Sequence, residues 1–118
     1  MLYTELTIKD KTYRLRLTTM GVMALEDKLG HNPVEIFMDL SEGRLPKVRE
    51  IVYIIHQALQ PYHNGFSVEK AAELLDSCAE EGMSIYELIS TTVMELFRNA
   101  GLLGKDDESQ EVEEEPKN

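Results

Sequence analysis

Residues 18–103 are divided into five segments of helical length, and this division restricts the possible folds more than any other feature of the chain. Each segment begins at a residue type that caps helices or at a proline, and ends at a glycine or before a proline. Within each segment apolar residues recur at spacings of three and four, as on one face of a helix. The starts are Thr18 or Thr19, Asn32, Pro46, Ser67 and Ser84, and the ends are Gly30, Gly43, Pro61, Gly82 and Gly101.

The third of these segments carries the widest apolar stripe. Together its apolar side chains cover about half of the helix circumference, more than a helix at the edge of a bundle needs. We therefore predict that it is the central helix. The residues of this stripe are Val48, Ile51, Val52, Ile54, Ile55, Ala58 and Leu59.

Residues 4–18 alternate between apolar and polar side chains, with a polar interruption at residues 9–11. Leu6 and Ile8 share one face, and Tyr13, Leu15 and Leu17 share one face after the interruption. This alternation, rich in Thr, Tyr and branched residues, predicts a β-hairpin. A lone hairpin is only marginally stable in water, so it must pack on the helices that follow.

The complete prediction is a mainly α fold of the α+β class, with an N-terminal β-hairpin followed by a bundle of about five helices. Residues 1–103 form a single helical domain, because a chain of 118 residues supplies one core and not two. After Leu103 apolar residues almost disappear, which predicts a disordered acidic C-terminal tail over residues 104–118. Such a tail either keeps the protein soluble or guards a binding face.

The charge of the chain disfavours two classes of partner. The formal net charge is −10, and residues 105–118 hold seven acids and two bases, so about half of the excess lies in the tail. A nucleic-acid binder needs Lys and Arg to displace counterions from phosphates, and an anionic membrane surface attracts basic proteins. We therefore expect no nucleic acid and no membrane among the partners.

Cys78 is the only cysteine, so the sequence gives no indication of a disulfide framework or of an oxidising compartment. The N-terminal residues show no basic region followed by an apolar run, and no apolar stretch approaches the ~20 residues of a membrane span. These features predict a cytoplasmic protein.

We find no pattern that indicates catalysis, a cofactor or a metal. His31, His56 and His63 do not share the spacing of metal ligands, and Cys78 has no second cysteine beside it. Neither a glycine-rich phosphate loop nor a G-x-S-x-G nucleophile motif occurs. The prediction is a binding protein that is not an enzyme and has no cofactor.

One group of apolar residues exceeds what a simple core requires. On the fifth helical segment, Met83, Tyr86, Met94 and Phe97 lie away from the centre of the main stripe when the segment is drawn as a regular α-helix. Methionine and aromatic side chains outside the core form adaptable protein-binding surfaces. The alternative is that this helix is covered on both faces and that all four belong to the core.

The order of the sequence elements resembles that of the tail assembly chaperones of long-tailed bacteriophages (siphophages) and prophages. The segments that carry the resemblance are 13–19 (YRLRLTT), 25–33 (LEDKLGHNP), 36–37 (IF), the start at 45–46 (LP), 56–60 (HQALQ) and 67–72 (SVEKAA). The resemblance covers about residues 6–103 and consists of structural signals in order, without a chemical motif.

The resemblance implies a chaperone of virion morphogenesis that binds the tape measure protein and keeps it soluble until tail tube subunits assemble around it. It also implies self-association into an oligomer, and action in the cytoplasm of the bacterial host with absence from the mature virion. Many such genes produce a longer isoform by ribosomal frameshift near the 3′ end, and Gly104-Lys105 is compatible with slippery codons. The alternative hypothesis is an acidic phage-encoded regulatory or inhibitor protein that binds a host factor.

Overall fold

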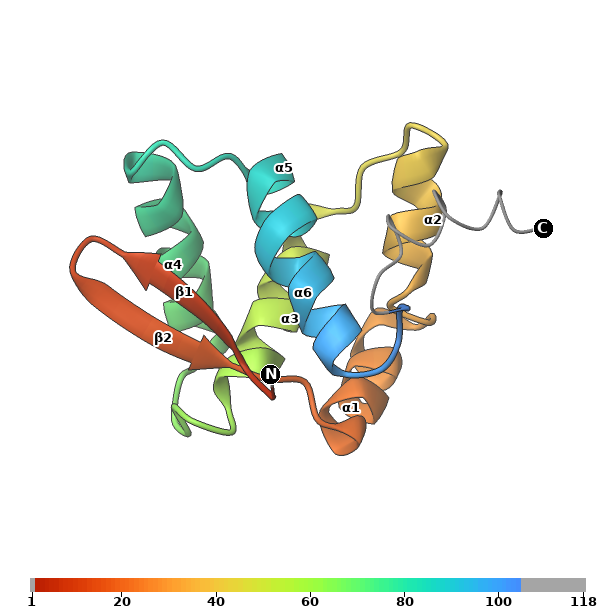
Figure 1. Ribbon diagram of the computed structural model, residues 1–118, viewed down its shortest axis with the longest axis horizontal. Helices are drawn as coiled ribbons and strands as arrows, with labels where there is room; N and C mark the ends of the chain where they lie inside the picture. Colours follow the sequence, from red (N-terminus) through yellow and green to blue (C-terminus); the bar gives the residue numbers. More distant parts are fainter. Residues whose placement is uncertain (1, 105–118) are drawn as a thin grey trace, which may run out of the picture.

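The chain starts with a β-hairpin and continues as helices (Figure 1), and the computed structural model describes residues 2–104. The last three helical elements follow one another without a break, so residues 2–104 form five helical bodies, as predicted. The predicted tail, residues 104–118, lies outside the described residues except for Gly104. The elements are β1 (Thr4–Ile8), β2 (Lys11–Leu15), α1 (Thr19–Leu29), α2 (Glu35–Ser41), α3 (Val48–Leu59), α4 (Val68–Glu80), α5 (Ile85–Leu88), the π-helical η1 (Ile89–Val93) and α6 (Met94–Asn99).

Three of the predicted helix caps are present. The hydroxyl oxygen of Thr18 accepts the N–H of Gly21 at 3.0 Å, and the Ser67 and Ser84 hydroxyls accept N–H groups three residues ahead in the same way. Each bond satisfies a backbone donor that a helix start leaves free. At the other end of α1, Gly30 takes a φ of 81°, the left-handed conformation in which glycine terminates helices.

The second and third helices begin slightly later than predicted. The side-chain oxygen of Asn32 accepts the N–H of Val34 at 3.0 Å, which closes a turn before the first regular residue of α2, Glu35. Asn32 therefore closes a turn that precedes the helix and is not itself the residue that caps the first helical turn. In α3, Lys47 keeps an extended conformation, so the helix begins at Val48, two residues after Pro46.

The predicted hairpin is present and packs on helices of its own chain. Its strands pair antiparallel from Thr4 with Leu15 to Ile8 with Lys11. At the two-residue turn, Lys9 adopts a φ of 56°, which is uncommon for a residue other than glycine. Its N–H donates to Glu81 at 3.1 Å, and its ammonium pairs with Glu80 at 3.0 Å. These contacts hold the hairpin tip against the C-terminal end of α4.

Helix α3 is the centre of the core, as its wide stripe predicted. In Figure 1 it runs between α4 on one side and α1 on the other, and α5 and α6 cross in front of it. Its side chains Ile51, Ile54, Ile55 and Leu59 are fully buried. The residue that follows β2 is hydrogen-bonded to the end of this helix, because the N–H of Arg16 donates to the carbonyl of Ala58 at 2.9 Å.

The last helical body contains a π turn that changes which residues face the core. The turn lies at η1, where Thr91 donates its hydroxyl to the carbonyl of Glu87 at 2.7 Å and competes for that acceptor. A π turn contains about one residue more than an α-helical turn. The side chains that follow it are therefore rotated about the helix axis by about 100° relative to their positions in a regular α-helix. The buried residues therefore recur in adjacent pairs every four positions: Leu88, Ile89, Thr92, Val93, Leu96 and Phe97.

Candidate functional site

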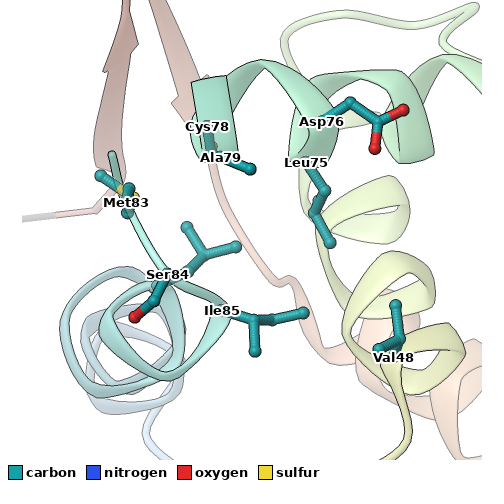
Figure 2. A pocket seen from close by; sticks show the side chains of 9 residues that line it. Val48, Leu75, Asp76, Cys78, Ala79, Met83, Ser84 and Ile85 are labelled. Carbon is teal, nitrogen blue, oxygen red and sulfur yellow. The ribbon is translucent and has the colours of Figure 1, made fainter. Parts of the chain in front are cut away.

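A groove with mainly apolar walls runs between α3, α4 and the start of α5. It consists of two adjoining hollows of about 210 and 570 Å³, and Val48 lines both. In Figure 2, Leu75 of α4, Ile85 of α5 and Val48 of α3 extend into the space between the three helices. We call this feature the α3–α4 groove and define it by Val48, Val52, Ala72, Leu75, Met83 and Ile85.

The walls of the groove are apolar side chains that the core covers only in part. Val48 is 61% exposed at the first turn of α3, although it belongs to the stripe that forms the core deeper in the helix. Leu75, Met83 and Ile85 are half-buried and pack against core residues with one side only. Concave apolar surfaces of this kind are typical of binding sites, whereas single exposed apolar residues on a convex surface need no explanation.

Cys78 lies at the inner side of the groove and is 3% exposed. Burial raises the pKa of its thiol above the usual range, and the nearby Glu81 carboxylate raises it further. The thiol is therefore protonated at neutral pH and is a weak nucleophile. In this groove the cysteine acts as a small apolar residue.

The two edges of the groove carry opposite charges. Lys47 and Arg49 line the α3 side, and Asp76 lines the α4 side. All three side chains are exposed. Charged groups beside an apolar surface determine the orientation and the specificity of a bound partner more than they determine its affinity.

A histidine on the far side of α3 fixes the start of that helix. The ring of His31 places Nε2 at 3.1 Å from a carboxylate oxygen of Glu50 and Nδ1 at 3.1 Å from the carbonyl of Asn32. Because both neighbours are acceptors, only the doubly protonated ring satisfies them both. The hydrogen bond to Glu50 raises the pKa of His31 above 6.5, with smaller contributions from the Asn32 carbonyl and Glu35. This contact joins the α1–α2 connection to the first turn of α3, next to Val48.

The structure separates the four residues predicted to form one exposed patch. Phe97 is fully buried, with its ring 5.2 Å from that of Phe37, so its assignment to a binding surface is wrong. The π turn is the reason, because it rotates Phe97 towards the core. Met94 is half-buried, Tyr86 is 58% exposed outside the groove, and Met83 lines the groove. Binding of a partner stays a prediction for these three.

The sequence pattern placed Val48 in the core stripe of the third segment, and it did not single out Leu75 or Ile85 as binding residues. The one available signal was the width of the α3 stripe, which exceeds what neighbouring helices can cover. Three methionines that the sequence did not single out are also exposed, namely Met20 and Met23 on α1 and Met38 on α2. They present flexible, polarisable side chains outside the groove.

Residues 2–104 contain neither a candidate membrane span nor a candidate metal site. None of the helices in this range is long and apolar enough to cross a membrane. Over the same range, no group of three or more His, Cys, Asp or Glu side chains is arranged to hold a metal ion.

Comparison with known protein families gives a match over nearly the whole chain. A family model described as a family of unknown function, DUF6096, matches residues 4–115. No curated protein and no solved structure matches the chain significantly.

Proposed function

The chain belongs to the DUF6096 family, and we propose that it is a phage tail assembly chaperone that binds the tape measure protein. In this role it keeps the tape measure protein soluble and helps to recruit tail tube subunits during tail assembly. It acts in the cytoplasm of the bacterial host, as an oligomer, and is absent from the mature virion. The resemblance of residues 6–103 to such chaperones supplies the identity of the client.

The observation that carries the proposal is the α3–α4 groove. A client that is long and helical presents amphipathic segments, and a helix binds to another protein by laying its apolar stripe in an apolar groove. The groove offers Val48, Leu75 and Ile85 for such contacts. A surface of this type suits a protein that holds a partner and does not transform a substrate.

The exposed methionines support the same function. Met20 is 73% exposed and Met23 is 52% exposed on the outer face of α1, where the core does not need them. Methionine adapts to partners of different shape because its side chain is unbranched and flexible. A chaperone that covers many different segments of one long client requires this adaptability.

The test is to co-express the protein with the tape measure protein of the same phage or prophage and to measure the soluble fraction of the client after ultracentrifugation. The wild type should keep most of the client soluble. Val48→Glu should lose most of this effect, because a bound client would bury the new carboxylate in the groove wall and remove its water. Leu2→Glu is the matched control, because Leu2 is 65% exposed and lies outside the groove. A client that sediments equally with and without the wild-type protein would contradict the proposal.

A second test uses the gene itself. Expression with its native downstream DNA and an N-terminal tag should give two products, the longer one read in another frame after Gly104-Lys105.

A mass measurement of purified complexes separates the proposal from the acidic inhibitor alternative. A coating chaperone binds in several copies per client chain, whereas an inhibitor of a host factor binds in a fixed small ratio.

A further inference from the structure

The α3–α4 groove has a basic edge and an acidic edge, and this asymmetry restricts what can bind there. On the α3 side, Lys47 and Arg49 line the groove. A third cation lies nearby, because the ammonium of Lys28 is 5.0 Å from the ring centre of Tyr53, which also lines the groove. The basic edge stands out on a chain with a net charge of −10.

The opposite edge is formed by the outer side of α4. Asp76 lines the groove there, and Glu69 precedes it by seven residues, which places both carboxylates on the same side of the helix two turns apart. Both side chains are exposed. The α4 edge of the groove therefore carries two carboxylates, one in its lining and one two turns before it.

Neither edge is neutralised from within residues 2–104. The ion pairs in this range join Lys9 with Glu80, His31 with Glu35 and Glu50, and Arg44 with Asp39 and Glu42. Lys47, Arg49, Glu69 and Asp76 take part in none of them. As far as residues 2–104 are concerned, their charges remain available to a bound partner.

The length of the groove sets the size of the segment that fits. Along α4 its lining residues run from Val68 to Ala79, which corresponds to about 16 Å at 1.5 Å per residue. A helix of about three turns covers this distance and presents apolar residues at positions i, i+3 or i+4, and i+7.

From these features we infer that the groove binds an amphipathic helix whose apolar stripe has acidic residues along the edge that faces α3 and basic residues along the edge that faces α4. This inference rests on the proposed helix-binding function and names the chemistry of the segment that the groove selects. Turning a helix end for end in the groove exchanges its two edges. The charges therefore also fix the direction in which the helix lies.

The inference is tested with three designed helical peptides of about 14 residues that share one apolar stripe. One has an acidic and a basic edge, one has two acidic edges and one has two basic edges. Fluorescence anisotropy measures their affinity for the wild-type protein at low salt. The peptide with opposite edges should bind about tenfold more tightly than the other two, because each of these meets a like charge along one side. The preference should shrink to about twofold in about 1 M salt, where the charges are screened.

The double variant Lys47→Glu/Arg49→Glu provides the sharper comparison. Both edges of its groove are acidic, so the peptide with two basic edges should become the tightest ligand. Both side chains are exposed, so the variant should fold, which circular dichroism and thermal melting check. The control Lys11→Glu/Lys70→Glu makes the same change of charge at exposed positions outside the groove and should keep the wild-type order of affinities.

Three outcomes would overturn the inference. The first is equal affinity for the three peptides, and the second is an order of affinities that the double variant leaves unchanged. The third is a dimer in sedimentation equilibrium that Val48→Glu dissociates, because a second copy would then occupy the groove. These results do not depend on the tape measure protein, so failure here is distinguishable from failure of the proposed function, which the co-expression test measures.

Discussion

Replacing Phe97 by alanine tests whether the π turn places this residue in the core. The side chain is fully buried and its ring meets that of Phe37 at 5.2 Å with an angle of 73° between the planes. Truncation of a buried phenylalanine to alanine costs about 3–5 kcal/mol, because the transfer energy is lost and a cavity remains. For a domain of this size each kcal/mol lowers the melting temperature by about 4–8 °C, so the melting temperature should fall by at least about 12 °C.

The assay is urea denaturation followed by circular dichroism, with thermal melting as a second measurement. Tyr86→Ala is the matched control, because its aromatic side chain lies on the same helical body but is 58% exposed. Its free energy of unfolding should change by about 0.5 kcal/mol or less. If Phe97→Ala prevents folding, Phe97→Leu should give a smaller and measurable loss, because leucine fills most of the space.

The contact with Phe37 gives an internal check. A double-mutant cycle between the two positions should return a coupling of about 0.5–1.5 kcal/mol, as edge-to-face aromatic pairs do. A change of less than about 1 kcal/mol in the free energy of unfolding of Phe97→Ala would contradict the buried position of Phe97. Phe97 would then lie on the surface, as a regular α-helix without the π turn would place it.

The protonated ring of His31 pairs with Glu50, and this pairing raises the pKa of His31 above its unfolded value near 6.5. The contribution of the pair to stability is therefore complete below pH 6.5 and is lost as the pH rises through the raised pKa. Urea titrations at several pH values should show that His31→Gln weakens this pH dependence of the free energy of unfolding. Ser84→Ala should lower the free energy of unfolding by about 1 kcal/mol without changing the urea m-value, because Ser84 caps α5. Cys78 should react with a thiol reagent at least about tenfold more slowly in the folded protein than in urea. Burial raises the pKa of its thiol and also shields the sulfur from the reagent. Equal rates in the two conditions would show that the groove opens readily.

The helices could be predicted from the sequence because their boundaries depend on local chemistry. Thr18, Ser67 and Ser84 cap helices through bonds to N–H groups only three residues away, and Gly30 ends α1 through its own backbone conformation. The π turn could not be predicted in this way. It results from hydroxyl competition for backbone acceptors together with the packing of adjacent apolar pairs, and the spacing of apolar residues alone fits either helix type.

The groove could not be predicted because it is made by residues far apart in the chain. Val48, Leu75 and Ile85 come from three helices whose relative placement depends on the whole core. Each residue alone looks like part of a core stripe. The hairpin tip shows the same dependence, because the contacts of Lys9 with Glu80 and Glu81 join opposite parts of the chain.

Val48 is a position where an apolar side chain contributes little to folding but should contribute strongly to binding. Full burial of a valine contributes about 1.5 kcal/mol or more, but Val48 is 61% exposed and realises only a small part of this. Its branched side chain is also a poorer helix former than Lys or Glu at the same place. Folding therefore gives little reason for an apolar residue here. If the groove is a binding site, Val48→Glu should abolish the binding of a helix while the free energy of unfolding stays within about 0.5 kcal/mol of the wild type. A loss of stability as large as the loss of binding would instead make Val48 a core residue, and the groove a packing defect.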